Sequence, residues 1–250
     1  MQKVLIAGGC GFIGHRVANL FLKQNYQVFI VDNYLSSDLS ITTNLDHYKL
    51  RLRSLCGAKI IDADICNVNK INTLFNRLKP NLVVHLANCP SAKVVNSEPF
   101  LYGEQIINGT LSLLQASLSN NVCKFVYVSS SMIYGDFLSS VINEDHPINP
   151  IELYGTFKAA SESIIRSYTK SHALCHAIIR PIAVYGPTGH TDFVITKYIK
   201  ATKQSGCIVV NGIDNCLSFT YVDDVAYGIY LAAISSKAIN ETFNTAIPVL

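Results

Sequence analysis

Tyr154 and Lys158 are two residues whose types and spacing could transfer a proton. They stand four positions apart at the start of a segment with helical apolar spacing, so both side chains share one face of the predicted helix. A free phenol has a pKa of about 10 and is a poor base at neutral pH, whereas a nearby cation stabilises its phenolate. A Tyr and a Lys at this spacing also occur often by chance, so an ordinary helix face is the alternative interpretation.

A run of three hydroxyl side chains gives the second candidate. Ser129, Ser130 and Ser131 follow an apolar run at 125–128, and open α/β sheets expose ligand-binding groups where such strands end. A serine there can hydrogen-bond both a reacting hydroxyl and the tyrosine oxygen, which orients the two groups for proton transfer. Serine runs also form ordinary loops after strands, so this motif alone leaves both interpretations open.

Three glycines and one aspartate indicate a dinucleotide site. Gly8, Gly11 and Gly14 lie between an apolar run at 4–7 and the helical spacing of 12–23, a context in which backbone N–H groups can approach a pyrophosphate. The alternative is a tight turn that only packs a helix on a strand. Asp32 ends the next apolar run, where a carboxylate accepts hydrogen bonds from the adenosine ribose and repels a 2′-phosphate. With no arginine between 33 and 50, NAD is favoured over NADP.

The elements that must position these residues alternate in type along the chain. Further apolar runs at 59–61, 82–86, 125–128 and 177–179 are separated by helix-length segments, whereas 33–57 is polar and irregular. This alternation predicts an α/β fold, a doubly wound parallel (Rossmann) sheet, and the shorter elements after Pro181 predict a small cap on that sheet. We expect an NAD-binding domain over 1–180, and a mainly substrate-binding region over 181–250 that is interleaved with it.

Composition narrows the class of protein. With 49% hydrophobic and 15% charged residues, the 250-residue chain can bury a large core, unlike disordered or fibrous proteins. A net charge of +3, with 20 basic and 17 acidic residues and no long like-charged run, predicts no nucleic-acid or membrane partner. The eight cysteines form no C-x-x-C or Cys/His cluster, which disfavours a metal site. Free thiols, and an N-terminus without an apolar signal region, predict a cytoplasmic location.

These motifs together resemble the extended short-chain dehydrogenases/reductases, in particular NAD-dependent sugar-nucleotide epimerases and dehydratases such as the UDP-glucose 4-epimerases. The resemblance covers residues 1 to about 245 and also rests on 84–87, 108–110, 180–181, 184–187 and 221–224. Because members of this family usually continue for several tens of residues more, the resemblance implies a C-terminally shortened substrate-binding cap. It implies that the catalytic residues are Ser130, Tyr154 and Lys158. The cofactor-binding residues that it implies are Gly8, Gly11, Phe12, Ile13, Gly14, Asp32, Asn33, Asp64, Ile65, Leu86, Ala87, Asn88, Ser129, Tyr154, Lys158 and Pro181. The implied substrate-binding residues are Lys93, Ser130, Ser131, Met132 and Tyr154. Asp64 could equally cap the helix that follows it.

The chemistry that the resemblance implies is a transient oxidation. Tyr154 would take the proton of a sugar hydroxyl, usually at C4, while that carbon passes a hydride to NAD. Family members that go on to 4,6-dehydration carry an Asp-Glu pair, or at least a Glu, directly after the catalytic Ser or Thr. Ser131 and Met132 occupy those positions here, and a thioether cannot transfer a proton. The resemblance therefore favours epimerisation through a 4-keto intermediate.

Some family positions that grip the nucleotide diphosphate are altered. Ala183 replaces an Asn, and Leu217 and Ser218 replace an Arg-Asp pair, which removes a bidentate phosphate clamp. Lys197, Lys200 and Lys203 are candidate substitutes or simply a solvated helix face. A UDP-sugar is the default substrate and a homodimer through 100–119 and the Tyr154 helix is expected. The alternatives are a dehydrogenase/reductase or dehydratase, and an NAD-binding regulatory protein without catalysis.

Overall fold

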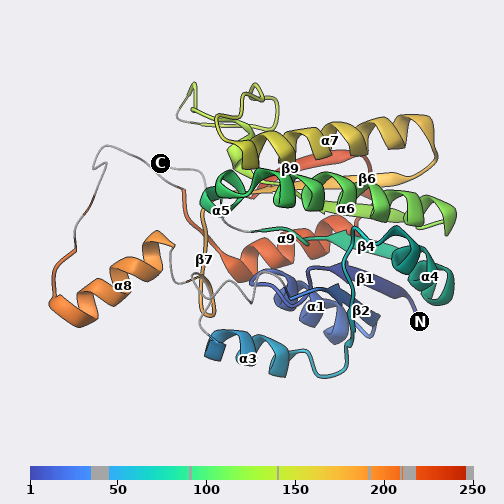
Figure 1. Cartoon of the computed structure of the whole chain (residues 1–250), viewed down its shortest axis with the longest axis horizontal. Helices are drawn as coiled ribbons and strands as arrows, with labels where there is room; N and C mark the ends of the chain where they lie inside the picture. Colours follow the sequence, from blue (N-terminus) through green and yellow to red (C-terminus); the bar gives the residue numbers. More distant parts are fainter. Residues whose placement is uncertain are drawn as a thin grey trace.

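A seven-stranded parallel sheet forms the centre of the chain (Figure 1). The computed structural model describes residues 1–34, 45–89, 92–139, 141–190, 193–208, 210 and 218–245. The strand order is β3-β2-β1-β4-β5-β6-β9, so the connections run outward in opposite directions from β1 and β4. This arrangement confirms the predicted doubly wound parallel sheet.

The strands and helices have the following bounds. The sheet contains β1 (Lys3–Ala7), β2 (Gln27–Asp32), β3 (Lys59–Asp62), β4 (Leu82–His85), β5 (Lys124–Val128), β6 (Cys175–Pro181) and β9 (Glu241–Thr245). The helices are α1 (Gly14–Lys23), α3 (Leu45–Ser54), α4 (Val68–Leu78), α5 (Ala92–Ser97), α6 (Pro99–Ser119), α7 (Leu153–Ser171), α8 (Val194–Ser205) and α9 (Val222–Ile234). The short elements are the 3-10 helices η1 (Ser131–Ile133) and η2 (Ser236–Ala238) and the pair β7 (Val184–Tyr185) and β8 (Thr220–Tyr221).

Two hydrophobic cores lie on opposite faces of the sheet because successive strand residues point to opposite sides. Val4 and Ile6 of β1 pack in the core that α1 and α9 complete. Leu5 and Ala7 pack in the other, with apolar residues of α4, α6 and α7. Burial on both faces explains why the strands read as continuous apolar runs in the sequence.

One part of the chain differs from the sequence-based expectation. The prediction that 33–57 is irregular is wrong for 45–54, which form α3, although its apolar periodicity is weak. After Pro181, α9 covers one face of the sheet, and β9 pairs with β6 in parallel. Figure 1 shows α8 projecting to one side of the sheet, beyond β7.

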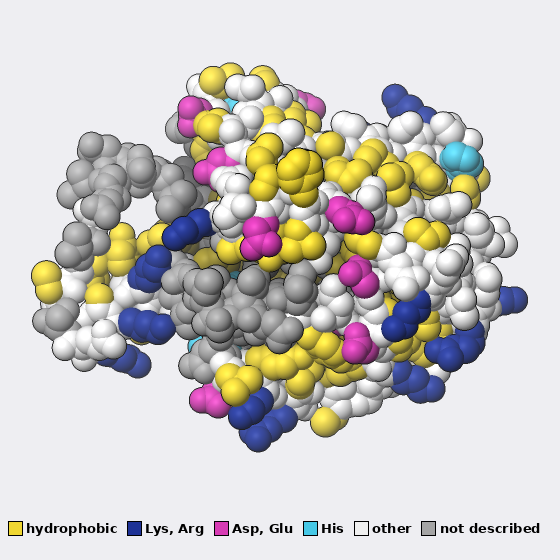
Figure 2. Space-filling model, in the orientation of Figure 1, with side chains coloured by type: hydrophobic (Ala, Val, Ile, Leu, Met, Phe, Trp, Pro, Cys, Tyr) yellow, Lys and Arg dark blue, Asp and Glu magenta, His cyan; other side chains and the backbone are white. Residues whose placement is uncertain are grey.

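The surface carries charges of both signs. On the face drawn in Figure 2, acidic side chains lie among hydrophobic ones, whereas Lys and Arg gather at the edge near the N-terminus and over α8. Among the described residues, no helix is long and apolar enough to cross a bilayer.

Candidate active site

The turn between β1 and α1 requires glycine at two positions. Gly8 has a φ of 80°, and a Cβ on it would lie 2.5 Å from the backbone nitrogen of Ala87. A Cβ on Gly14 would lie 2.2 Å from the carbonyl oxygen of Gly8. The turn thus brings bare backbone to the start of α1, which is the cradle that a dinucleotide pyrophosphate requires.

Asp32 is fixed at the end of β2 beside this turn. Its Oδ2 accepts a hydrogen bond from the Cys10 backbone N–H at 2.9 Å, and its Oδ1 accepts one from the Tyr34 N–H at 2.9 Å. Burial raises the pKa of Asp32, and the two backbone N–H groups oppose that shift. The predicted ribose-binding carboxylate is therefore held in one orientation before any ligand binds.

Asp64 follows β3 and does not cap the next helix. Asn67 is the N-cap of α4, accepting the Lys70 N–H at 3.0 Å, whereas Asp64 Oδ1 accepts the Cys66 N–H at 2.8 Å. The capping alternative for Asp64 is thus wrong, and its side chain lines the same pocket as the glycine turn.

Two polar atoms in the pocket-lining residues lack partners. Asn88 Oδ1, after β4, and Ser129 Oγ, after β5, are buried and accept or donate no hydrogen bond within the described part of the chain. Buried polar atoms are normally satisfied, so these two are consistent with groups that a bound ligand completes. Together with the glycine cradle and Asp32, they fit a dinucleotide cofactor.

Ser130, Tyr154 and Lys158 meet at the ends of β5 and α7. Ser130 caps η1 by accepting the Met132 N–H at 3.2 Å, and its hydroxyl lies near enough to the Tyr154 phenol to lower the pKa of that phenol. Lys158, one turn along α7, donates to the Val128 carbonyl oxygen at 2.7 Å. Its Nζ also lies 4.6 Å from the Tyr127 ring centroid. The structure therefore brings the three predicted catalytic residues to one place, and all three line the pocket.

Burial controls the pKa of both members of the Tyr-Lys pair. It raises the pKa of Tyr154 to about 12, although the Ser130 hydroxyl opposes the shift. Burial lowers the pKa of Lys158 to about 7, although the nearby Glu162 carboxylate raises it. The expected stabilisation of the phenolate by Lys158 is thus outweighed, because both groups are removed from water. The remaining stabilisation of the Tyr154 phenolate would have to come from the positive charge of a bound cofactor.

The predicted site residues line one pocket of about 460 Å³, a volume typical of small-molecule sites. Every predicted cofactor- and substrate-binding residue lies along it except Lys93, which is exposed on α5. We call Gly8, Gly11, Phe12 and Gly14 with Asp32 the glycine wall. Three aromatic residues also line the pocket, and we call them the aromatic wall: Tyr185, Phe193 and Phe219. The His190 ring contacts both walls, with centroids 6.4 Å from Phe12 and 5.1 Å from Phe193.

Arg51 is a pocket residue that sequence reasoning missed. It belongs to α3, which lies in the segment that looked irregular, and it is buried. Its Nε donates to the Thr188 carbonyl oxygen at 3.1 Å, and its guanidinium lies 6.0 Å from the Phe12 ring centroid. Burial and then Arg16 lower its pKa to about 10, so it keeps its charge at neutral pH. In the sequence, Arg51 directly follows the arginine-free segment 33–50, and no motif marks it as a pocket residue.

The altered family positions leave the aromatic wall apolar. Ala183 lines the pocket, and among the described pocket-lining residues after Pro181 there is no Arg or Lys. The lysines of α8 are exposed and lie outside the pocket lining, which agrees with a solvated helix face. Leu217 lies outside the described residues. Tyr185 belongs to the 184–187 motif, but Phe193 lies in no motif, and the sequence analysis did not predict that the members of the aromatic wall line the pocket together.

Comparisons with known proteins give one family. The family model described as the NAD dependent epimerase/dehydratase family matches residues 4–246. A UDP-glucuronate 4-epimerase from Thermodesulfobacterium geofontis is 32% identical over 231 residues, covering 91% of this chain and 70% of that protein. A human dTDP-D-glucose 4,6-dehydratase is 29% identical over 251 residues, covering 97% of this chain and 68% of the relative.

A solved structure shares the fold over nearly the whole chain. The UDP-glucuronic acid 4-epimerase from Bacillus cereus, in complex with UDP-glucuronic acid and NAD, is similar with a TM-score of 0.87 and 27% identity. The similarity covers 98% of this chain and 77% of that structure. The relatives thus include epimerases as well as a dehydratase.

Proposed function

Because this chain belongs to the NAD dependent epimerase/dehydratase family, and so is an NAD-dependent sugar-nucleotide enzyme, we propose that its reaction is epimerisation. The substrate would be a nucleotide-activated sugar, by default a UDP-sugar, and the reaction would pass through a transient 4-keto intermediate. The relatives include both epimerases and dehydratases, so the choice between them rests on residues of this chain.

Each catalytic side chain has a definite task in this proposal. Tyr154 takes the proton of the sugar hydroxyl, and Ser130, whose hydroxyl lowers the pKa of the phenol, orients the two oxygens. Lys158 contributes positive charge beside the phenol and is anchored to the Val128 carbonyl. NAD, when bound, accepts the hydride from the carbon. The glycine wall and Asp32 would hold that cofactor.

Met132 is the single observation that favours epimerisation. It lines the pocket beside Ser130 and Ser131, where family members that dehydrate carry an acid. A thioether can neither give nor take a proton, so elimination of water from the neighbouring carbon has no acid or base at this position. Epimerisation needs none, because the ketosugar only has to turn over and take its hydride back on the other face.

The test is incubation of the purified protein with UDP-glucose, UDP-glucuronic acid and dTDP-glucose. Epimerisation gives a product of unchanged mass, with inverted stereochemistry by nuclear magnetic resonance and no net change in NADH absorbance. A product lighter by one water would instead identify a dehydratase, and a stoichiometric NADH signal would identify a dehydrogenase or reductase. Either of these two results would overturn the proposal.

A homodimer is also part of the proposal. Phe100 and Leu101 at the start of α6 are exposed, and so are Ile151 and Leu153 beside the start of α7. Helices α6 and α7 pack side by side, so two copies could join these faces in a four-helix interface. Sedimentation at micromolar concentration should show a dimer, and a monomer there would contradict it.

A further inference from the structure

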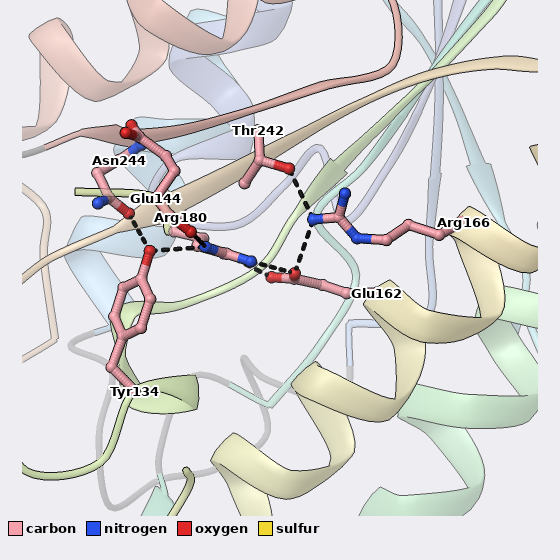
Figure 3. A network of polar contacts seen from close by, with 7 residues as sticks. All are labelled: Tyr134, Glu144, Glu162, Arg166, Arg180, Thr242 and Asn244. Atoms are coloured by element: carbon pink, nitrogen blue, oxygen red, sulfur yellow. Dashed lines mark hydrogen bonds and ion pairs between the residues drawn. The ribbon is translucent and has the colours of Figure 1, made fainter. Parts of the chain in front are cut away.

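Arg180 is a buried arginine of β6 that contacts residues on two elements carrying predicted catalytic side chains. Its side chain is only 2% exposed, as is appropriate for a charge with a full set of partners. Nη2 and Nε donate to Glu162 Oε2 and Oε1 at 2.7 and 3.0 Å, and Nη1 donates to the Tyr134 hydroxyl at 2.7 Å (Figure 3). A forked contact of this kind fixes orientation as well as charge.

The partners of Arg180 lie on the elements that carry the catalytic side chains. Glu162 is on α7, one helical turn after Lys158 and two after Tyr154. Tyr134 directly follows η1, the turn that Ser130 caps, and it is fully buried. The guanidinium of Arg180 therefore links α7 to the end of η1.

The network extends into β9. The Tyr134 hydroxyl donates to Asn244 Oδ1 at 2.7 Å, and the Asn244 backbone N–H donates to Glu144 Oε1 at 2.6 Å (Figure 3). Arg166 bonds Thr242 Oγ1 at 2.7 Å and Glu162 only at 3.5 Å, and its side chain is 39% exposed. Arg180 is thus the cation that joins the two catalytic elements, and Arg166 is a peripheral partner of the same carboxylate.

The two elements also touch directly, so a small shift between them changes the site. A Cβ on Gly155, next to Tyr154, would lie 2.4 Å from the Met132 carbonyl oxygen in η1. Hydrogen bonding and proton transfer are sensitive to displacements well below 1 Å. The relative position of α7 and η1 sets the contact between Ser130 and Tyr154.

We propose that Arg180 and Glu162 are positioning residues, whose ion pair and contact with Tyr134 hold Ser130 and Tyr154 in place for proton transfer. The inference rests on the proposed role of Tyr154 as the base, and goes beyond it by assigning a catalytic effect to residues outside the pocket lining. Neither Arg180 nor Glu162 lines the pocket, so their effect is transmitted through α7 and η1.

Glu162 has a second effect through charge. The titratable groups around Lys158 are Glu162 and Tyr154 on α7, His85 on β4 and Tyr127 on β5. Those facing Glu162 itself are Arg166 and Lys158 on α7, Arg180 and His176 on β6, Tyr127 on β5 and Tyr134 after η1. Glu162 raises the pKa of Lys158, which burial has lowered to about 7. Removing the carboxylate charge lets Lys158 lose its proton at a lower pH.

The first test is Glu162→Gln, which keeps the size of the side chain and an acceptor for Arg180. With a UDP-sugar that the wild type converts, we expect kcat to fall at least about tenfold while KM and the affinity for NAD change by less than about twofold. The alkaline limb of the kcat profile should move to lower pH. A merely structural role would not move this limb. Unchanged kcat and an unchanged pH profile would overturn the proposal.

Substitutions of the arginines separate position from charge. Arg180→Lys keeps the charge but loses the fork, so kcat should fall without a shift of the alkaline limb. Arg166→Gln is the matched control, because it removes the peripheral cation of the same carboxylate, and kcat should stay within about twofold of wild type. Equal losses in Arg180→Lys and Arg166→Gln would contradict the role of Arg180. Arg180→Met with Glu162→Leu avoids an uncompensated buried charge and should fold yet remain slow.

A titration without turnover distinguishes this inference from the proposed function. Ultraviolet difference absorbance of the NAD-loaded protein, with Tyr154→Phe in the same background as the blank, measures ionisation of that phenol. Glu162→Gln should raise the pKa of Tyr154 because Lys158 carries less charge, and an unshifted titration would refute the coupling. An active Tyr154→Phe variant would sink the proposed function instead, whatever the titration shows.

Discussion

The glycine wall and the aromatic wall of the pocket differ in the chemical groups that they present to a ligand. The glycine wall presents backbone at the ends of neighbouring strands, and its shape follows from three glycines within one turn. The aromatic wall presents side chains from β7, from the residue before α8 and from the residue before β8. Backbone recognition depends on a local pattern, whereas side-chain recognition depends on contacts between segments far apart in the chain. The cofactor is therefore easier to assign than the substrate.

Tyr154→Phe should have the largest effect, because it removes the proton acceptor without touching either wall. Loss of general base catalysis costs on the order of 10²–10⁴-fold in kcat. NAD affinity, measured by fluorescence titration with NADH, should remain within about threefold because the glycine wall is unchanged. Phe keeps the packing of the ring against the cluster of Cys89, Val95, Tyr102 and Ile106. Wild-type turnover would remove Tyr154 as the base.

Gly14→Ala should break the glycine wall itself. The added Cβ would lie 2.2 Å from the Gly8 carbonyl oxygen, so the turn must open and the pyrophosphate cradle deform. We expect NAD affinity to fall at least about tenfold and the protein to lose about 1 to 3 kcal/mol of stability. Calorimetry and thermal unfolding measure these two effects. Gly206→Ala is a control, because a Cβ at Gly206 meets nothing within 4 Å. The φ of 68° at Gly206 costs it only local backbone strain.

Asp32→Asn should sharpen the difference in cofactor selectivity between NAD and NADP. The amide loses the charge that repels a 2′-phosphate and replaces one of the oxygens that accept backbone N–H groups. We expect the affinity for NAD to fall about tenfold, while the affinity for NADP stays the same or rises. Competition of each dinucleotide with NADH gives the ratio. An unchanged ratio would count against the ribose role of Asp32.

Sequence reasoning predicted the fold, which the structure confirms, and it predicted all five residues of the glycine wall as cofactor-binding, because both predictions depend on local patterns. Apolar runs indicate the strands, and glycines at fixed spacing indicate the turn. The Tyr-Lys pair was found because a helix places residues four apart on one face. What the sequence could not give was non-local: α3 has weak periodicity, and β9 became a strand through its pairing with β6. The lowered pKa of Lys158 likewise depends on burial, which spacing does not encode.

Arg51 is a pocket residue that no local sequence pattern predicts. Its substitution should have the smallest effect on the affinity for NAD. It approaches the glycine wall from α3, and the charge of Asp32 acts on it. Arg51→Met should weaken NAD binding only about two- to fivefold, because the guanidinium also serves the Thr188 carbonyl. Arg53→Met, an exposed neighbour on the same helix, is the matched control and should leave the affinity unchanged.

A double variant at Arg51 tests which charge controls the affinity for NADP. In wild type, Asp32 repels a 2′-phosphate while Arg51, which lines the same pocket, could attract one. Any NADP binding gained in Asp32→Asn should therefore be lost again in the double variant with Arg51→Met, but kept in the double variant with Arg53→Met. If both double variants bind NADP equally well, the gain comes from removing repulsion alone. Arg51 would then be a structural tether of the 186–190 segment.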